Sequence, residues 1–174
     1  METYFKSLNL TIRFSWKPNI FTLDDRIMLD RYRRGELQRP DVVILHKSTH
    51  DAFQRKENYN GWIMTDYVHY INGRSRQMVE AYDEVFSHVP ILWRAPFYRK
   101  DWGPSDDLNK LMRQIEEFTR PHLAKHNIRV LETSTILDRK RGAPNLFDRM
   151  HPYKFVNYVL LDTALSTICK HVDE

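Results

Sequence analysis

The stretch Asp41-Val42-Val43-Ile44-Leu45-His46, which follows Pro40, decides the fold class of this chain. Its apolar residues run on without alternating with polar ones. That pattern is typical of a strand buried on both faces, as in a parallel sheet. The polar residues 47–51 come next and predict a loop at the carboxyl end of this strand. A parallel sheet needs crossover connections, so helices are expected on either side of this strand in the sequence.

The rest of the chain supplies such an alternation of strands and helices. Further strands are predicted at residues 10–16, 90–95 and 128–133. Helices are predicted from Thr22 or Asp24 to Gly35, in two stretches broken near Asn72-Gly73, from Ser105 to a kink or end at Pro121, and after Pro152. This order predicts a three-layer α/β/α domain, with a central, mostly parallel sheet of about four strands and helices on both faces.

Length and composition indicate a single globular domain over residues 1–174. The chain is 41% hydrophobic, and its net charge of +4 is scattered, so no nucleic-acid partner is expected. No apolar stretch is long enough to span a membrane, and no signal peptide opens the sequence. The single cysteine, Cys169, cannot form an internal disulfide. The sequence determines neither the compartment nor the oligomeric state.

The most informative short pattern is Phe147-Asp148-Arg149-Met150-His151-Pro152, just before the final predicted helix. A carboxylate at Asp148 can accept a hydrogen bond from one nitrogen of the His151 imidazole. That hydrogen bond leaves the other nitrogen as a general base. The alternative is structural: a loop or capping aspartate beside a surface histidine. The loops holding residues 47–51, 96–102 and 148–151 are all expected at the carboxyl edge of the sheet, where open α/β sheets bind ligands.

With these motifs in place, the chain resembles the SGNH/GDSL-type hydrolases over roughly residues 8–170. Within that superfamily it is most similar to the PC-esterase and trichome-birefringence-like acyl-esterase branch. The motifs that carry the resemblance are Trp16-Lys17-Pro18, Pro40-Asp41-Val42-Val43-Ile44-Leu45, Arg94-Ala95-Pro96, and Asp148 with His151. The resemblance implies a flavodoxin-like fold and an O-acyl esterase or acyltransferase activity. It also implies an acylated carbohydrate or lipid as substrate, no cofactor, and a location in the secretory pathway or the cytoplasm.

The resemblance assigns roles to particular residues. A serine attacks the ester, His151 takes its proton and Asp148 orients His151. An oxyanion or substrate-binding region is expected near the end of the residue 41–46 strand and at the residue 90–95 strand; its candidate residues are His46, Ser48, His50, Asp51 and Arg94. Nothing in the chain reads Gly-Asp-Ser, the block that carries the family's serine, and residues 46–51 contain no Gly or Asn. The first strand is therefore expected to be missing and the domain to be incomplete at its N-terminus. The absence of that strand is expected to leave a gap, an unpaired edge, or a re-paired strand at residues 10–16.

Several of these residues allow other interpretations. His46 and His50 have a spacing that suits a metal on a helix, but they straddle a strand end and no third ligand is evident, so no metal site is predicted. Ser48 is a substitute nucleophile or an ordinary turn residue. Phe97, Tyr98 and Trp102 line an acyl or sugar site or pack within their own loop. The alternative function is a non-catalytic, degenerate SGNH-like domain that binds a glycan or a protein.

Overall fold

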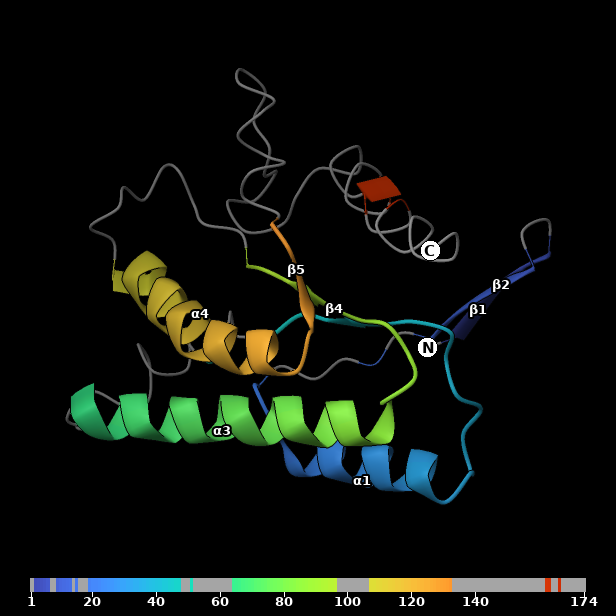
Figure 1. The fold of residues 1–174 in the computed structure, drawn as a ribbon, viewed down its shortest axis with the longest axis horizontal. Helices are drawn as coiled ribbons and strands as arrows, with labels where there is room; N and C mark the ends of the chain where they lie inside the picture. The colour runs from blue at the N-terminus through green and yellow to red at the C-terminus, as the bar shows by residue number, and fades with distance from the viewer. Residues whose placement is uncertain are drawn as a thin grey trace.

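The structure is a computed structural model that describes most of the first three quarters of the chain. The described residues are 2–6, 9–13, 15, 19–47, 51, 64–96, 107–132, 162, 163 and 166. They contain two sheets and three helices (Figure 1). The predicted final helix lies mostly outside this part of the chain, although Asp162, Thr163 and Ser166 are helical.

The main sheet is parallel, as the apolar runs predict. It contains β3 (Val43–Leu45), β4 (Ile91–Arg94) and β5 (Arg129–Leu131), in the order β3-β4-β5. Leu45 pairs with Trp93, and Trp93 pairs with Val130, so the three carboxyl ends meet at one edge. Helix α3 (Met64–Val85) connects β3 to β4, and α4 (Asp107–Lys125) connects β4 to β5. Because such crossovers are right-handed and step in the same direction, α3 and α4 cover the same face of the sheet.

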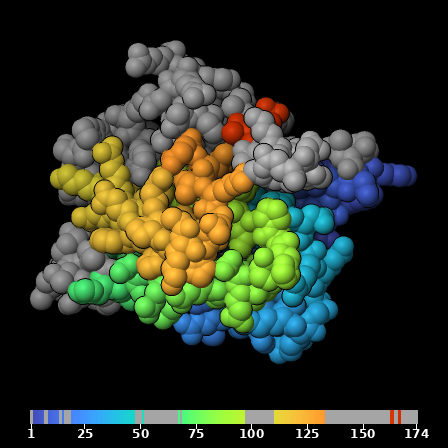
Figure 2. Space-filling view, viewed as in Figure 1, coloured from blue at the N-terminus to red at the C-terminus, as the bar shows by residue number. Residues whose placement is uncertain are grey.

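Helix α1 (Leu23–Arg33) packs beside α3, which lies between α1 and α4 in Figure 1. Its start was readable from the sequence, since Thr22 is the N-cap and forms a capping box with Asp25. The helix ends at Arg34, and Gly35 adopts a φ of 72°, which favours glycine. The mixed α/β architecture with a parallel central sheet is confirmed. In the space-filling view, α4 and α3 form adjoining bands across one face (Figure 2).

Residues 10–13 form a strand, but not in the parallel sheet. Strand β2 (Leu10–Arg13) pairs antiparallel with β1 (Glu2–Phe5), a strand that the sequence reading did not foresee. The turn between them contains Asn9 with a φ of 47°, a conformation that asparagine tolerates well. Glu2 and Arg13 form an ion pair of 2.8 Å across the hairpin. This segment therefore pairs locally in a hairpin and not in the parallel sheet, and a re-paired strand at residues 10–16 is one of the arrangements expected above.

The two helical stretches expected around Asn72-Gly73 are one continuous helix, so the predicted break is wrong. A glycine inside a helix costs about 1 kcal/mol relative to alanine, which packing can offset. Asn72 Oδ1 lies 2.9 Å from His122 Nε2, and Ser75 Oγ lies 3.0 Å from Thr119 Oγ1. These contacts hold α3 against α4 on both sides of Gly73. The helix therefore continues across a position that its own sequence does not favour.

Pro121 does not end α4, which continues to Lys125. A proline inside a helix removes one backbone hydrogen bond, at a cost of about 3 kcal/mol or more. Leu123, in the turn beyond Pro121, is 0% exposed and packs into the core, so the last turn is held by tertiary contacts. Burial of this side chain offsets part of that cost.

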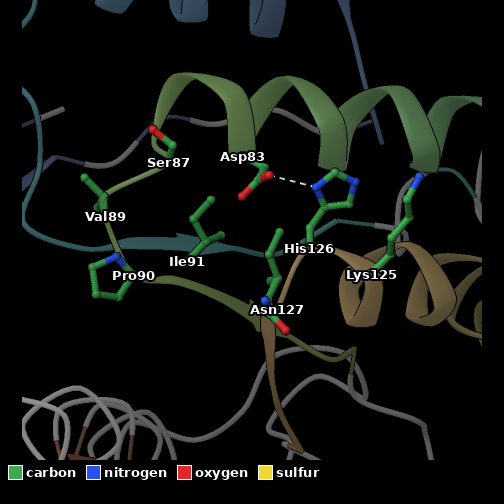
Figure 3. A pocket seen from close by; sticks show the side chains of 9 residues that line it. Asp83, Ser87, Val89, Pro90, Ile91, Lys125, His126 and Asn127 are labelled. Carbon is green, nitrogen blue, oxygen red and sulfur yellow. Dashed lines mark hydrogen bonds and ion pairs between the residues drawn. The ribbon is translucent and has the colours of Figure 1, made fainter. Parts of the chain in front are cut away.

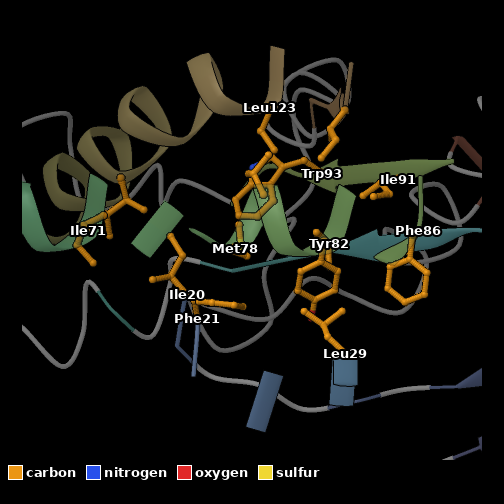
Figure 4. Packing of buried hydrophobic residues seen from close by; sticks show 14 of the residues in the cluster. Ile20, Phe21, Leu29, Ile71, Met78, Tyr82, Phe86, Ile91, Trp93 and Leu123 are labelled. Atoms are coloured by element: carbon orange, nitrogen blue, oxygen red, sulfur yellow. The ribbon is translucent and has the colours of Figure 1, made fainter. Parts of the chain in front are cut away.

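The core lies between the sheet and the three helices (Figure 4). Trp93 on β4 is fully buried, with Met78 of α3 and Leu123 of α4 around it. Its indole Nε1 donates a hydrogen bond of 3.0 Å to the carboxyl group of Glu116, which is 2% exposed. Burial raises the pKa of Glu116 to about 7, partly offset by this hydrogen bond and by Arg120. A titratable group on α4 is therefore buried in the core of the domain.

Candidate active site at the carboxyl edge of the sheet

The ends of the three parallel strands are joined to one another at the carboxyl edge. His46 follows β3, and its Nδ1 lies 3.0 Å from the carbonyl oxygen of Arg94 at the end of β4. The Ala95 N–H donates a hydrogen bond of 3.2 Å to the carbonyl of Leu131 at the end of β5. His46 is exposed, whereas Arg94 is half-buried. The structure thus brings two of the predicted binding residues, His46 and Arg94, to one place.

Lys47 begins the predicted binding loop with its side chain turned inward. Its Nζ donates hydrogen bonds to Asp25 Oδ1 at 3.2 Å and to the Asn19 carbonyl at 3.0 Å. The side chains of Lys47 and Asp25 are 4% and 0% exposed. The Tyr82 hydroxyl also donates to Asp25 Oδ1, at 3.1 Å. This buried cluster joins the loop to α1 through Asp25 and to α3 through Tyr82.

The cluster contains a buried ion pair between Lys47 and Asp25, and the Asp25 carboxylate accepts hydrogen bonds from several donors. Asp25 Oδ2 also accepts hydrogen bonds from the backbone N–H and the hydroxyl of Thr22, each 2.8 Å long. A buried ion pair is tolerated when additional hydrogen bonds satisfy its atoms, as they do for this carboxylate. Burial and the Asp25 carboxylate both raise the pKa of Tyr82, so this hydroxyl remains a hydrogen-bond donor. The arrangement gives the loop a rigid starting point.

Asp51, at the other end of the loop, is also buried. Its carbonyl oxygen accepts a hydrogen bond of 3.1 Å from the Tyr67 hydroxyl on α3. Its carboxyl group is hydrogen-bonded by the Ile20 N–H, and burial raises its pKa to about 6 despite the nearby positive charge of Lys47. Its Oδ2 has no hydrogen-bond partner within the described ranges. Asp51 thus anchors the loop; the substrate-binding role expected for it stays a prediction.

Two buried anchors, Lys47 and Asp51, therefore bracket residues 48–50. Ser48 and His50 belong to this segment and lie outside the described residues. Their predicted roles are untested by the described geometry.

Arg94 brings positive charge to the same edge. Burial lowers the pKa of its guanidinium to about 10, so it remains protonated at neutral pH. A cation at this edge suits an anionic transition state or a polar substrate. The predicted base and its orienting residue, His151 and Asp148, lie outside the described residues, and their mutual distance stays a prediction.

The sequence reading missed the buried cluster of Lys47, Asp25 and Tyr82. One signal was present, because Thr22-Leu23-Asp24-Asp25 has the pattern of a capping box, which places Asp25 in the first turn of a helix. Nothing in the local sequence indicates that Lys47 points inward, since lysine in a polar loop is ordinarily solvated.

A separate pocket of about 360 Å³ lies at the opposite edge of the sheet (Figure 3). It is bordered by Pro90 and Ile91 at the start of β4 and by Asn127 and Ile128 just before β5. His126 Nδ1 lies 2.7 Å from Asp83 Oδ2 within it. Ligands of open α/β sheets bind at the carboxyl ends of the strands, so this amino-terminal pocket is a poor candidate for the active site.

Two other classes of site are not seen in the described part of the chain. Its residues include no group of three or more His, Cys, Asp or Glu side chains that could hold a metal ion. Of the helices described, none has the length and hydrophobicity needed to cross a membrane.

The fold and this edge define an α/β domain with a parallel sheet, whose carboxyl edge is the candidate site. Among solved structures, the chain is similar to LAE5, an alpha/beta hydrolase enzyme from the metagenome of Lake Arreo, Spain. That alignment has a TM-score of 0.61 and 18% identity, and covers 86% of this chain and 68% of LAE5. The chain is also similar to Axe2, an acetylxylan esterase from Geobacillus stearothermophilus, with a TM-score of 0.57 and 20% identity, covering 80% of this chain and 66% of Axe2.

These likenesses show that the chain has the fold of these hydrolases and esterases and spans about two thirds of their length. Structures of catalytic mutants of Axe2 replace a serine, an aspartate and a histidine with alanine. The aspartate and the histidine are three positions apart in Axe2. No protein-family model matches the chain, and no curated protein matches it.

Proposed function

We propose that this chain is an SGNH-type O-acyl esterase or acyltransferase domain, of the PC-esterase kind, that acts on an acylated carbohydrate or lipid. One observation carries the proposal. Asp148 and His151 have the same spacing as the aspartate and histidine replaced in the catalytic mutants of Axe2, an esterase that shares this fold. The position of this pair after the last predicted strand also matches the edge where such sheets bind ligands.

In the proposed reaction, a serine hydroxyl attacks the carbonyl carbon of the ester and its proton passes to His151. Asp148 accepts a hydrogen bond from the other imidazole nitrogen and stabilises the imidazolium that forms. His151 then donates the proton to the departing alcohol oxygen, which leaves an acyl-serine. Water hydrolyses this intermediate in an esterase, and a second alcohol takes the acyl group in an acyltransferase.

The loop between Lys47 and Asp51 is proposed to supply the oxyanion donors. Its two buried anchors support this assignment, because stabilisation of an oxyanion depends on donors that do not reorganise during the reaction. No serine of residues 1–174 stands in a Gly-Asp-Ser block, so the proposed mechanism takes its nucleophile from outside this sequence.

A non-catalytic binding domain is the second candidate. It is favoured by residues 46–51, where Lys47 forms a buried ion pair and neither Gly nor Asn is present to donate to an oxyanion. Such a domain would use the same edge to bind a glycan or a protein without turning it over.

The purified chain can be tested with an acetyl-ester reporter and a fluorophosphonate probe for reactive serines. We expect little or no turnover and no labelling, because a triad without its nucleophile retains only the residual effect of binding and the oxyanion hole. Joining the chain to the segment encoded upstream of Met1 is expected to restore both signals. His151→Ala should then abolish turnover. His88→Ala should not, because His88 is exposed and lies just before the amino-terminal end of β4, away from the carboxyl edge.

Other results would redirect the assignment. Turnover by the chain alone that is lost in both His151→Ala and Ser48→Ala would make Ser48 the nucleophile. Turnover lost in His151→Ala and kept in Ser48→Ala would indicate direct activation of water. If the extended chain binds an acetylated glycan without labelling or turnover, the non-catalytic candidate is correct.

A further inference from the structure

A single peptide group, between Asn19 and Ile20, is bound by both ends of the loop that follows β3. Its carbonyl oxygen accepts a hydrogen bond of 3.0 Å from Lys47 Nζ, and its N–H donates to the carboxyl group of Asp51. The Ile20 side chain is 1% exposed and belongs to the hydrophobic core (Figure 4). Lys47 and Asp51 are therefore both bound to a peptide group that the core holds in place.

The two contacts differ in how well their charges are compensated. The Lys47 ammonium group also pairs with the buried carboxylate of Asp25. Asp51 is 6% exposed, and its Oδ2 is buried with no hydrogen-bond partner in the described part of the chain. A buried carboxylate oxygen without a donor is costly, and the cost is larger when the carboxyl group is charged. The Asp51 contact is therefore the one of the two that depends on protonation.

The groups around Asp51 compensate its charge only in part. The cation beside it, Lys47, is already paired with Asp25 on α1, so two carboxylates share one ammonium group once Asp51 ionises. Helix α3 contributes two hydroxyls, from Tyr67 to the carbonyl oxygen of Asp51 and from Tyr82 to Asp25. Burial, the largest effect, acts with the Asp25 carboxylate to raise the pKa of Asp51 to about 6, although backbone hydrogen bonds and Lys47 lower it.

We propose that Asp51 is a pH-sensitive clip, which holds the Asn19–Ile20 peptide group while its carboxyl group is neutral and releases it more readily once that group ionises. A released carboxylate is hydrated, so ionisation favours the released state. The contact of Lys47 with the same peptide group persists over this range, because its charge is paired with Asp25. The clip is a property of the fold and does not depend on the proposed esterase function.

The size of the effect follows from the two states of the carboxyl group. When released, Asp51 is expected to titrate near its ordinary pKa of 3.8, whereas burial raises the pKa of the bound group to about 6. The equilibrium constant for release should then rise about tenfold between pH 5 and pH 8. The uncharged Asp51→Asn side chain has the shape of the neutral acid, so this variant should keep the contact and lose the pH dependence.

Amide hydrogen exchange, measured by NMR on the full 174-residue chain, tests the release of Ile20. After correction for the intrinsic exchange rate, the protection of the Ile20 amide should fall about tenfold from pH 5 to pH 8. It should be constant over that range in Asp51→Asn. Glu116→Gln is the control, because it removes another buried carboxyl group with a raised pKa and should leave the tenfold fall unchanged. Constant protection in the wild type, a fall that persists in Asp51→Asn, or one that disappears in Glu116→Gln overturns the proposal.

A second measurement needs no substitution. In the unmutated chain with ¹³C-labelled aspartate, the side-chain carboxyl carbon of Asp51 should titrate with a midpoint of about 6. The amide proton of Ile20 should shift with the same midpoint, because it donates to that carboxyl group. An Asp51 midpoint near 4, or an Ile20 amide proton that does not titrate, overturns the proposal. Neither measurement requires turnover, so failure of the clip and failure of the proposed function are distinguishable.

Discussion

Replacing Lys47 with methionine should destabilise the domain strongly, because it removes the cation from a buried pair and leaves its partner in place. The side chains have nearly the same length, so the lost interactions are those of the ammonium group. These include its contacts with Asp25 Oδ1 at 3.2 Å, Asp25 Oδ2 at 3.4 Å and the Asn19 carbonyl at 3.0 Å. The carboxylate of Asp25 would remain fully buried without a counter-ion at that position.

The magnitude follows from what Asp25 keeps. Removing one partner of a buried ion pair costs about 3–5 kcal/mol. Asp25 retains the Tyr82 hydroxyl and the two Thr22 donors, so the lower end, about 3 kcal/mol, is expected for Lys47→Met. The double variant Lys47→Met/Asp25→Asn has no unpaired charge and should lose less, about 1–2 kcal/mol, which reflects the weakened capping box. The double variant should thus be more stable than the single one.

Equilibrium urea unfolding, followed by tryptophan fluorescence near neutral pH, measures these differences. Arg33→Met is the control, because Arg33 pairs with Glu84 at 3.1 Å where the two side chains are 40% and 67% exposed. Exposed pairs contribute about 0–1 kcal/mol, so this variant should remain close to wild type. The reasoning is refuted if Lys47→Met is no more destabilising than Arg33→Met, or if the double variant loses more free energy than Lys47→Met alone.

Two further predictions concern the helices. Burial raises the pKa of Glu116 from its ordinary 4.5 to about 7, so the folded state binds this proton more tightly than the unfolded state does. Its contribution to the free energy of unfolding is therefore complete below about pH 4.5 and is lost as the pH rises through 7. Glu116→Gln should remove up to about 3 kcal/mol of this pH dependence, and parallel wild-type and variant curves of unfolding free energy against pH would contradict it. Gly73→Ala should stabilise α3 by about 0.5–1 kcal/mol, because a Cβ added there meets nothing within 4 Å, whereas Gly35→Ala should destabilise because of its φ of 72°. Thermal unfolding of both glycine variants tests this pair, and a lower melting temperature for Gly73→Ala would be the contrary result.

The sequence by itself determined the elements whose signals are local. Continuous apolar runs predict parallel strands, and β3, β4 and β5 lie within the predicted runs. The central strand β4 is the most buried of the three, whereas Ile44 of β3 is 46% exposed. Thr22 begins α1 because a capping box is complete within four consecutive residues. The Asp148 and His151 pair was likewise identified by spacing and by its place along the chain, and its geometry remains a prediction.

Only the tertiary structure decided the features that depend on distant partners. The Asn72-Gly73 pair predicts a helix break, yet contacts with α4 stabilise α3 as a continuous helix through these residues. Local helix propensity cannot predict those contacts, because the partners lie on another helix. Residues 10–13 have the pattern of a strand, but a strand pattern does not name its neighbour, and here that neighbour is β1. Lys47 reads as a solvated loop residue. It is buried because Asp25 and Tyr82, far away in the sequence, place a carboxylate and a hydroxyl beside it. This ion pair forms only when the end of β3, α1 and α3 have packed together.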